Sequence, residues 1–185
     1  MRHLVLLLLV GSSFGCNPVY SLQPIGEKAR SLVADKAEWE GTWIHDEGAV
    51  TIAVTDAEHG KLVIAWFEKI NERLEPRSYE VELRSVGKWT FASVKDPDKK
   101  PMRYVFARVE KKERQLLLSA PNLDAWQAMV KTKKLPGTLT VTKTETGSSS
   151  EITVGTLGAK ELAFITSEER AALFDRPSPM LKLTK

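Results

Sequence analysis

Two histidines and a few hydroxyl and carboxyl side chains are the residues of this chain that could support hydrolytic or metal chemistry. His45 begins the polar run His45-Asp46-Glu47, and His59 follows Glu58, so the two clusters could meet at one end of a sheet and bind a metal ion. A convincing zinc site, however, needs three or four ligands at defined spacing. Both clusters lie in turn-like polar segments, so the sequence favours solvated turns and no metal.

Nucleophilic and phosphate chemistry are equally weakly supported. Ser148, Ser149 and Ser150 are predicted to lie in an exposed loop, and the sequence contains no Gly-x-Ser-x-Gly elbow. Glu168 and Glu169 are adjacent, so on a helix they point to different faces, as acidic first-turn residues do. No glycine-rich loop opens a helix to hold a phosphate. The sequence therefore predicts a protein that is not an enzyme and has no catalytic residues.

The single cysteine, Cys16, follows a stretch with the organisation of a secretory signal. A basic start at Arg2 precedes an apolar run over residues 4–10 and then small residues up to Gly15. The run is too short to cross a bilayer as a helix, which needs about 20 residues. We therefore expect residues 1–15 to be a signal peptide.

Gly15-Cys16 resembles the cleavage site of bacterial lipoproteins, in which Gly or Ala precedes the modified cysteine. The resemblance implies a covalent lipid on Cys16 as the anchor to the membrane, with no other cofactor. Two or more acyl chains anchor a protein stably. Asn17 in place of Asp then favours a cell-envelope location at the outer membrane, facing the periplasm. Ser13-Phe14-Gly15 also fits ordinary secretion without a lipid, and this alternative stays open.

Composition limits the remaining possibilities. The 185 residues contain 27 Lys and Arg against 24 Asp and Glu, so the small positive excess gives no reason to expect nucleic acid as a partner. One cysteine cannot form a disulfide within the chain, so stability must come from burial of apolar side chains, including five Trp and six Phe.

Most of the chain is predicted to form short strands. Residues 17–24 are polar and contain two prolines, so residues 16–38 are expected to be the lipidated N-terminus and a tether with a short helix over 26–38. Residues 39–185 are expected to form a single domain. Its first strands cover 41–45, 50–55 and 62–67, and the third is apolar on both faces, which predicts cover by the interior and by a helix. Further strands are predicted over 78–86, 88–95, 102–110 and 114–120.

The last third of the chain mixes helices and strands. Asn122 is expected to cap a helix that Pro136-Gly137 ends, and residues 159–174 are expected to be helical with a break at Thr166. Short strands are predicted around 139–141 and 152–154. Residues 180–183, after Pro179, are predicted to be the closing strand.

This order of motifs resembles a group of bacterial lipoproteins whose soluble part is a lipocalin-like barrel. The residues that carry the resemblance are Pro18-Val19-Tyr20, Gly41-Thr42-Trp43, Leu123 with Trp126, Glu161-Leu162 with Phe164, and Leu173-Phe174. It implies a mainly β fold with minor α content, in which an antiparallel up-and-down meander closes into a barrel with two or three short helices packed on it. It also implies that Trp43 plugs the closed end against a basic side chain.

The sequence thus predicts a non-enzymatic, membrane-anchored binding module. Its partner would be an apolar small molecule held inside the barrel, and the residues expected to line the cavity are Ile52, Ile64, Trp66, Trp89 and Phe106. The alternative is a structural or assembly lipoprotein with a fully packed core that binds another envelope protein.

Overall fold

An antiparallel meander forms the body of the protein. The computed structural model describes residues 18–46, 48–70, 72–144 and 147–183. Seven consecutive strands each pair with the next, and their bounds are β3 (Gly41–His45), β4 (Gly48–Asp56), β5 (Lys61–Ile70), β6 (Arg73–Val86), β7 (Trp89–Asp96), β8 (Arg103–Lys112) and β9 (Gln115–Ser119).

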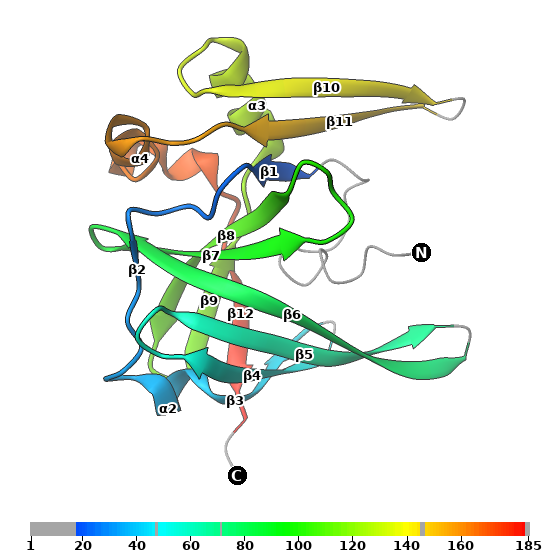
Figure 1. The fold of residues 1–185 in the computed structure, drawn as a ribbon, viewed down its shortest axis with the longest axis vertical. Coiled ribbons are helices and arrows are strands. Elements are labelled where there is room, and N and C mark those ends of the chain that lie inside the picture. The colour runs from blue at the N-terminus through cyan, green and yellow to red at the C-terminus, as the bar shows by residue number, and fades with distance from the viewer. Residues whose placement is uncertain (1–17, 47, 71, 145–146, 184–185) are drawn as a thin grey trace.

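The eighth strand, β12 (Ser178–Lys182), closes the barrel. It pairs antiparallel with β9 on one edge and with β3 on the other. The fold is therefore the expected mainly β architecture, a closed eight-stranded antiparallel barrel with a few short helices (Figure 1). The predicted closing strand over 180–183 is confirmed in position, and it begins two residues earlier.

Alternation of apolar and polar residues determines which side chains face the barrel interior. On β4, Val50, Ile52 and Val54 are buried, whereas Thr51 and Thr55 are exposed. On β5 the inward row begins with Leu62 and continues through residues 64, 66 and 68. The outward face of β5 is not covered by a helix, contrary to our expectation, and Phe67 on that face is 70% exposed.

The helices cover β7 and β8 instead. A second core lies on the outer face of these two strands, beneath α3 (Leu123–Lys131), α4 (Ala159–Ile165) and the 3-10 helix η1 (Glu168–Leu173). Asn122 caps α3 as expected, because its Oδ1 accepts a hydrogen bond from the backbone N of Ala125 at 3.0 Å. The predicted break near Thr166 separates α4 from η1.

Three more strands extend the sheet beside β8. β10 (Gly137–Thr144) and β11 (Gly147–Val154) form a hairpin, and β1 (Val19–Ser21) lies between β11 and the first part of β8. The serines at 148–150 therefore belong to a strand and not to the exposed loop that we predicted, because β10 supplies backbone partners along the whole of β11.

The prediction of a tether in residues 16–38 is also corrected by the structure. Residues 17–24 contain β1, whose side chains are buried because the strand pairs on both edges. The predicted helix over 26–38 is reduced to α2 (Lys36–Trp39), and β2 (Lys28–Ala29) pairs with the end of β6 that extends past β5. The chain is thus already part of the folded body at Val19. Within the described parts of the chain, no helix is long and apolar enough to cross a membrane.

Candidate ligand-binding site in the barrel

The two ends of the barrel differ, and one of them is sealed. Trp43 is fully buried there, and its Nε1 donates a hydrogen bond to the backbone O of Trp39 in α2 at 2.9 Å. Lys182 of β12 lies over the ring of Trp43, with Nζ 5.6 Å from the centroid, within the range of a cation–π contact. Its Nζ also donates to the backbone O atoms of Ala37 and Glu38. The expected plug at Trp43 is confirmed, and Lys182 is its basic side chain.

Aromatic side chains line the half of the barrel nearer the other end, which we call the open end. It is formed by the β3–β4, β5–β6 and β7–β8 turns and by the start of β12. The rings of Trp66 on β5 and Tyr79 on β6 stack with centroids 5.6 Å apart and an interplanar angle of 10°. Ile64 packs against the same core. Burial raises the pKa of the Tyr79 phenol above its ordinary value.

The indole N–H of Trp66 is the unusual group in this half of the barrel. Trp66 is only 8% exposed, and its Nε1 has no hydrogen-bond partner among the described residues. Leaving a buried donor without a partner costs about 1–3 kcal/mol. This N–H is closed off in the empty protein, so an acceptor atom of a bound molecule can reach it only when neighbouring side chains move aside.

An ion pair between a buried carboxylate and a partly exposed guanidinium lies further toward the open end. Glu68 continues the inward row of β5 and is 9% exposed, and its Oε2 accepts a hydrogen bond from Nε of Arg77 at 2.9 Å. This hydrogen bond raises the pKa of the Arg77 guanidinium. The inner surface thus changes from apolar near Trp43 to aromatic and then charged at the open end.

A polar cluster on four chain segments, which we call the Tyr20 cluster, extends this charged surface. It consists of Tyr20 on β1, Asp96 at the end of β7, Lys99 in the following turn, Arg103 on β8 and Glu151 on β11. The Tyr20 hydroxyl donates to Oδ2 of Asp96 at 3.1 Å, and Lys99 and Arg103 both lie over the Tyr20 ring and donate to Glu151.

Electrostatics in the Tyr20 cluster favour a neutral phenol and a charged carboxylate. Burial, reinforced by the negative charge of Asp96, raises the pKa of Tyr20 far above its usual value. Burial opposes ionisation of Glu151, but hydrogen bonds from Lys99 and Arg103 outweigh it and hold the pKa of Glu151 below its usual range. Nε of Arg103 is buried and, within the described part of the chain, has no partner. Sequence spacing gave no signal for this cluster, because its members come from distant segments.

The five residues predicted to line a cavity are divided between the two cores. Ile52, Ile64 and Trp66 face the barrel interior together. Trp89 and Phe106 lie in the second core outside the barrel, where Arg108 stacks on Trp89 and Phe106 meets Trp126 edge-on. The predicted lipid-bearing residue, Cys16, lies outside the described residues.

The residues considered for metal and hydrolytic chemistry do not converge. His45, at the end of β3, lies at the open end and shares a hydrogen bond of 2.6 Å with Ser178, whereas His59 lies in the β4–β5 turn at the opposite end and contacts Asp56. No group of three or more potential metal ligands occurs among the residues that the structure describes. Glu168 forms a surface ion pair with Lys88.

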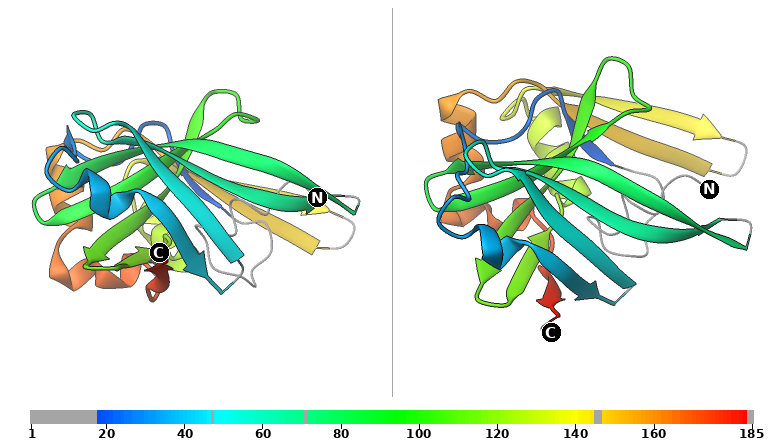
Figure 2. Two further views of the ribbon diagram at one scale, coloured as in Figure 1. Left: turned by 90° about the horizontal axis from the view of Figure 1, so that it is seen from below. Right: turned by 60° about the horizontal axis from the view of Figure 1, so that its bottom comes forward.

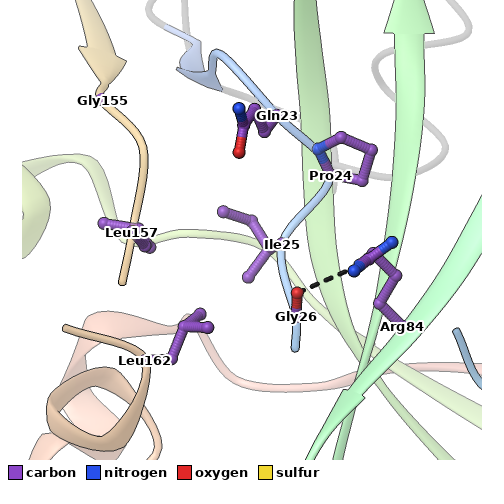
Figure 3. A pocket seen from close by; sticks show the side chains of 8 residues that line it. All are labelled: Gln23, Pro24, Ile25, Gly26, Arg84, Gly155, Leu157 and Leu162. Carbon is purple, nitrogen blue, oxygen red and sulfur yellow. Dashed lines mark hydrogen bonds between the residues drawn. The ribbon is translucent and has the colours of Figure 1, made fainter. Parts of the chain in front are cut away.

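One pocket lies outside the barrel, where the segment after β1 passes between β6 and α4 (Figure 3). Ile25, Leu157 and Leu162 point into it. The Arg84 guanidinium at its edge already donates to Gly26 O, Glu27 O and Glu82. The hydrogen bonds of this guanidinium are therefore made within the protein, whereas the indole N–H of Trp66 in the barrel has no partner among the described residues.

The fold and the site together define a closed antiparallel β-barrel protein with a sealed apolar end and an aromatic, charged open end. Comparisons with protein-family models, with curated proteins and with solved structures found no significant match.

Proposed function

We propose that the protein is a non-enzymatic binding module, anchored to the outer membrane by a lipid on Cys16 and facing the periplasm. Its barrel would hold an apolar ligand that carries a hydrogen-bond acceptor. The observation that carries this proposal is the buried, unpartnered N–H of Trp66 on the inner surface of the barrel. A donor of this kind costs stability in the empty protein and gains a partner when a ligand binds.

The surroundings of Trp66 indicate the kind of ligand. An eight-stranded barrel is just wide enough to be filled by side chains or to hold one small ligand. The stacked rings of Trp66 and Tyr79 offer a flat apolar surface, and the Glu68–Arg77 pair lies on the open-end side of it. An amphiphile such as a fatty acid matches this gradient, with its chain against the rings and its polar group toward the open end.

Titration of the purified protein with fatty acids tests the proposal. We expect the tryptophan emission to change in a saturable manner, and the thermal midpoint to rise because the ligand binds only the folded state. Trp66→Phe should abolish or strongly weaken this binding. Trp89→Phe is the matched control, because Trp89 lies in the other core, and it should bind as the parent does. Equal binding by both variants would exclude a site at Trp66.

Packing of the barrel favours a second candidate function. Trp43, Trp66 and Leu62 are all buried in one eight-stranded interior, which is how a fully packed barrel is built. The protein would then be an assembly lipoprotein that binds another envelope protein through its surface. In that case no fatty acid should change the emission or the thermal midpoint, and crosslinking in cells should capture a specific envelope protein.

The anchor itself has an independent test. The intact mass of the protein extracted from membranes should correspond to residues 16–185 plus a diacylglyceryl group and an acyl chain. A mass without lipid would disprove the anchor and leave the binding proposal to the titration.

A further inference from the structure

The start of β1 holds Cys16 close to the folded body. β1 runs parallel to β11 with Val19 opposite Ile152, and the backbone N of Ile152 donates to Pro18 O at 3.2 Å. Val19 is only three positions after Cys16, so the two Cα atoms are about 10 Å apart at most. A lipid on Cys16 therefore brings the bilayer surface up to the protein.

The β10–β11 hairpin extends past this point in the direction from which the chain enters β1. Gly147, the first residue of β11, lies five residues before Ile152 on a strand that runs parallel to β1. Five strand residues span about 16 Å, which is more than the reach of the anchor segment. Gly147 therefore lies further out than the anchor segment can reach, on the side from which the chain enters β1.

The β5–β6 hairpin projects on the same side of the molecule (Figures 1 and 2). Near its tip, Phe67 and Leu74 are each 70% exposed, and Phe67 lies opposite Pro76 on the same outward face. Lys69, on that face, forms an ion pair with Glu72 in the turn. Two large apolar side chains on a protruding hairpin are typical of a surface that another phase or molecule covers.

We infer that this side of the protein docks on the surface of the bilayer. Phe67 and Leu74 enter the headgroup region, and the open end of the barrel faces the lipid from which a ligand could come. This inference rests on the proposed anchor at Cys16, because the short reach of residues 16–19 is what directs this side toward the membrane. Interfacial side chains bury to a depth of about 5–10 Å, which suits a hairpin tip at the headgroups.

A thiol-reactive fluorophore can test the contact in the full lipidated protein. The lipid blocks the sulfur of Cys16, so an introduced Leu74→Cys becomes the only free thiol. Val33→Cys is the matched control, because Val33 is 63% exposed and lies next to α2 at the sealed end. Both labelled proteins are reconstituted into phosphatidylethanolamine–phosphatidylglycerol vesicles, with and without lipids that carry a nitroxide quencher at headgroup depth.

We expect the nitroxide lipids to quench the label at position 74 several-fold more than the label at position 33. Equal quenching at the two positions, or none at either, in protein that floats with the vesicles would overturn the inference. The same result is expected if the hairpin binds another protein and not the bilayer. A failed anchor is distinguishable, because the unlipidated chain would not float and would carry a second label on Cys16.

Discussion

Replacement of Trp66 by Phe should leave the folded protein almost as stable as the parent, although Trp66 is a buried aromatic residue. The matched substitution is Trp126→Phe. Trp126 is fully buried in the second core, and its Nε1 donates to Leu173 O at 2.7 Å. Each substitution removes one ring of the indole from a packed core, so the two changes have a similar cost in packing.

The difference between the two variants comes from hydrogen bonding. Trp126→Phe removes the hydrogen bond from the indole, which contributes about 0.5–1.5 kcal/mol in addition to packing, while Leu173 O keeps the hydrogen bond from the backbone N of Asn122 at 2.8 Å. Trp66→Phe removes a buried donor that had no partner. This change raises the free energy of unfolding by about 1–3 kcal/mol and offsets part of the packing loss. With the packing costs cancelling, the two free energies of unfolding should differ by roughly 3 kcal/mol, and Trp66→Phe should be the more stable variant.

Urea unfolding measured by far-ultraviolet circular dichroism provides the comparison. The chain over residues 16–185 with Cys16→Ser avoids interference from the lipid. The slopes of free energy against urea concentration should agree, so that midpoints report stability directly. If Trp66→Phe lowers the free energy of unfolding as much as Trp126→Phe does, the indole N–H of Trp66 has a partner in the empty protein and our reasoning about the site is refuted.

Two further predictions concern the ends of the barrel. Lys182→Met removes the cation over Trp43 and the donors to Ala37 O and Glu38 O. It should therefore lower the free energy of unfolding by about 2 kcal/mol. Lys69→Met, on an exposed strand, is the control and should change the free energy of unfolding little. Equal thermal midpoints for these two variants would show that Lys182 does not stabilise the sealed end of the barrel. The second prediction concerns the pKa of Glu151. Burial acts to raise this pKa, but the hydrogen bonds from Lys99 and Arg103 have the larger effect, so the pKa lies below its usual value. Its contribution to stability is fully present above the usual glutamate pKa and is lost as the pH falls through the lower pKa of the folded state. Glu151→Gln should therefore be less stable than the parent at neutral pH, and its stability should depend less on pH in this acidic range. Urea unfolding at a series of pH values measures both effects. Parallel curves of stability against pH for the parent and the variant would count against the ion pair.

The barrel could be predicted because its strands carry local signals. Val50, Ile52 and Val54 alternate with polar residues, and β4 has the same inward face in the structure. Turn residues at regular spacing predicted the meander, and the short apolar segment after Pro179 predicted the strand that closes it. These features depend on residues that are close in sequence, which is why they could be identified from the sequence alone.

The second core could not be predicted, because it depends on contacts between distant segments. A strand that is apolar on both faces is covered twice, and we applied this rule to β5. In the structure, the strands covered on both faces are β7 and β8. Phe91 and Phe106 face the helices, whereas Ala92 and Val94 face the barrel interior. For the same reason Trp89 and Phe106 were assigned to the wrong side of the sheet.

The candidate site was only half visible in the sequence. Ile64 and Trp66 were identified as inward residues, but the importance of Trp66 depends on its unpartnered N–H, which no sequence pattern reveals. Tyr20 was assigned to a tether because β1 is short and lies next to Pro18. Its burial arises from pairing with β8 and β11, and tertiary pairing of this kind overrides local preference.

β12 is the last barrel strand in chain order, and this order has a consequence for biogenesis. Until Ser178 to Lys182 have been synthesised, β3 and β9 are the two open borders of a seven-stranded sheet, and each presents backbone groups that other chains can pair with. The growing polypeptide is thus most vulnerable to aggregation after β9 has been made and before β12 has been made. A product that terminates ahead of Ser178 keeps both borders open for its whole lifetime.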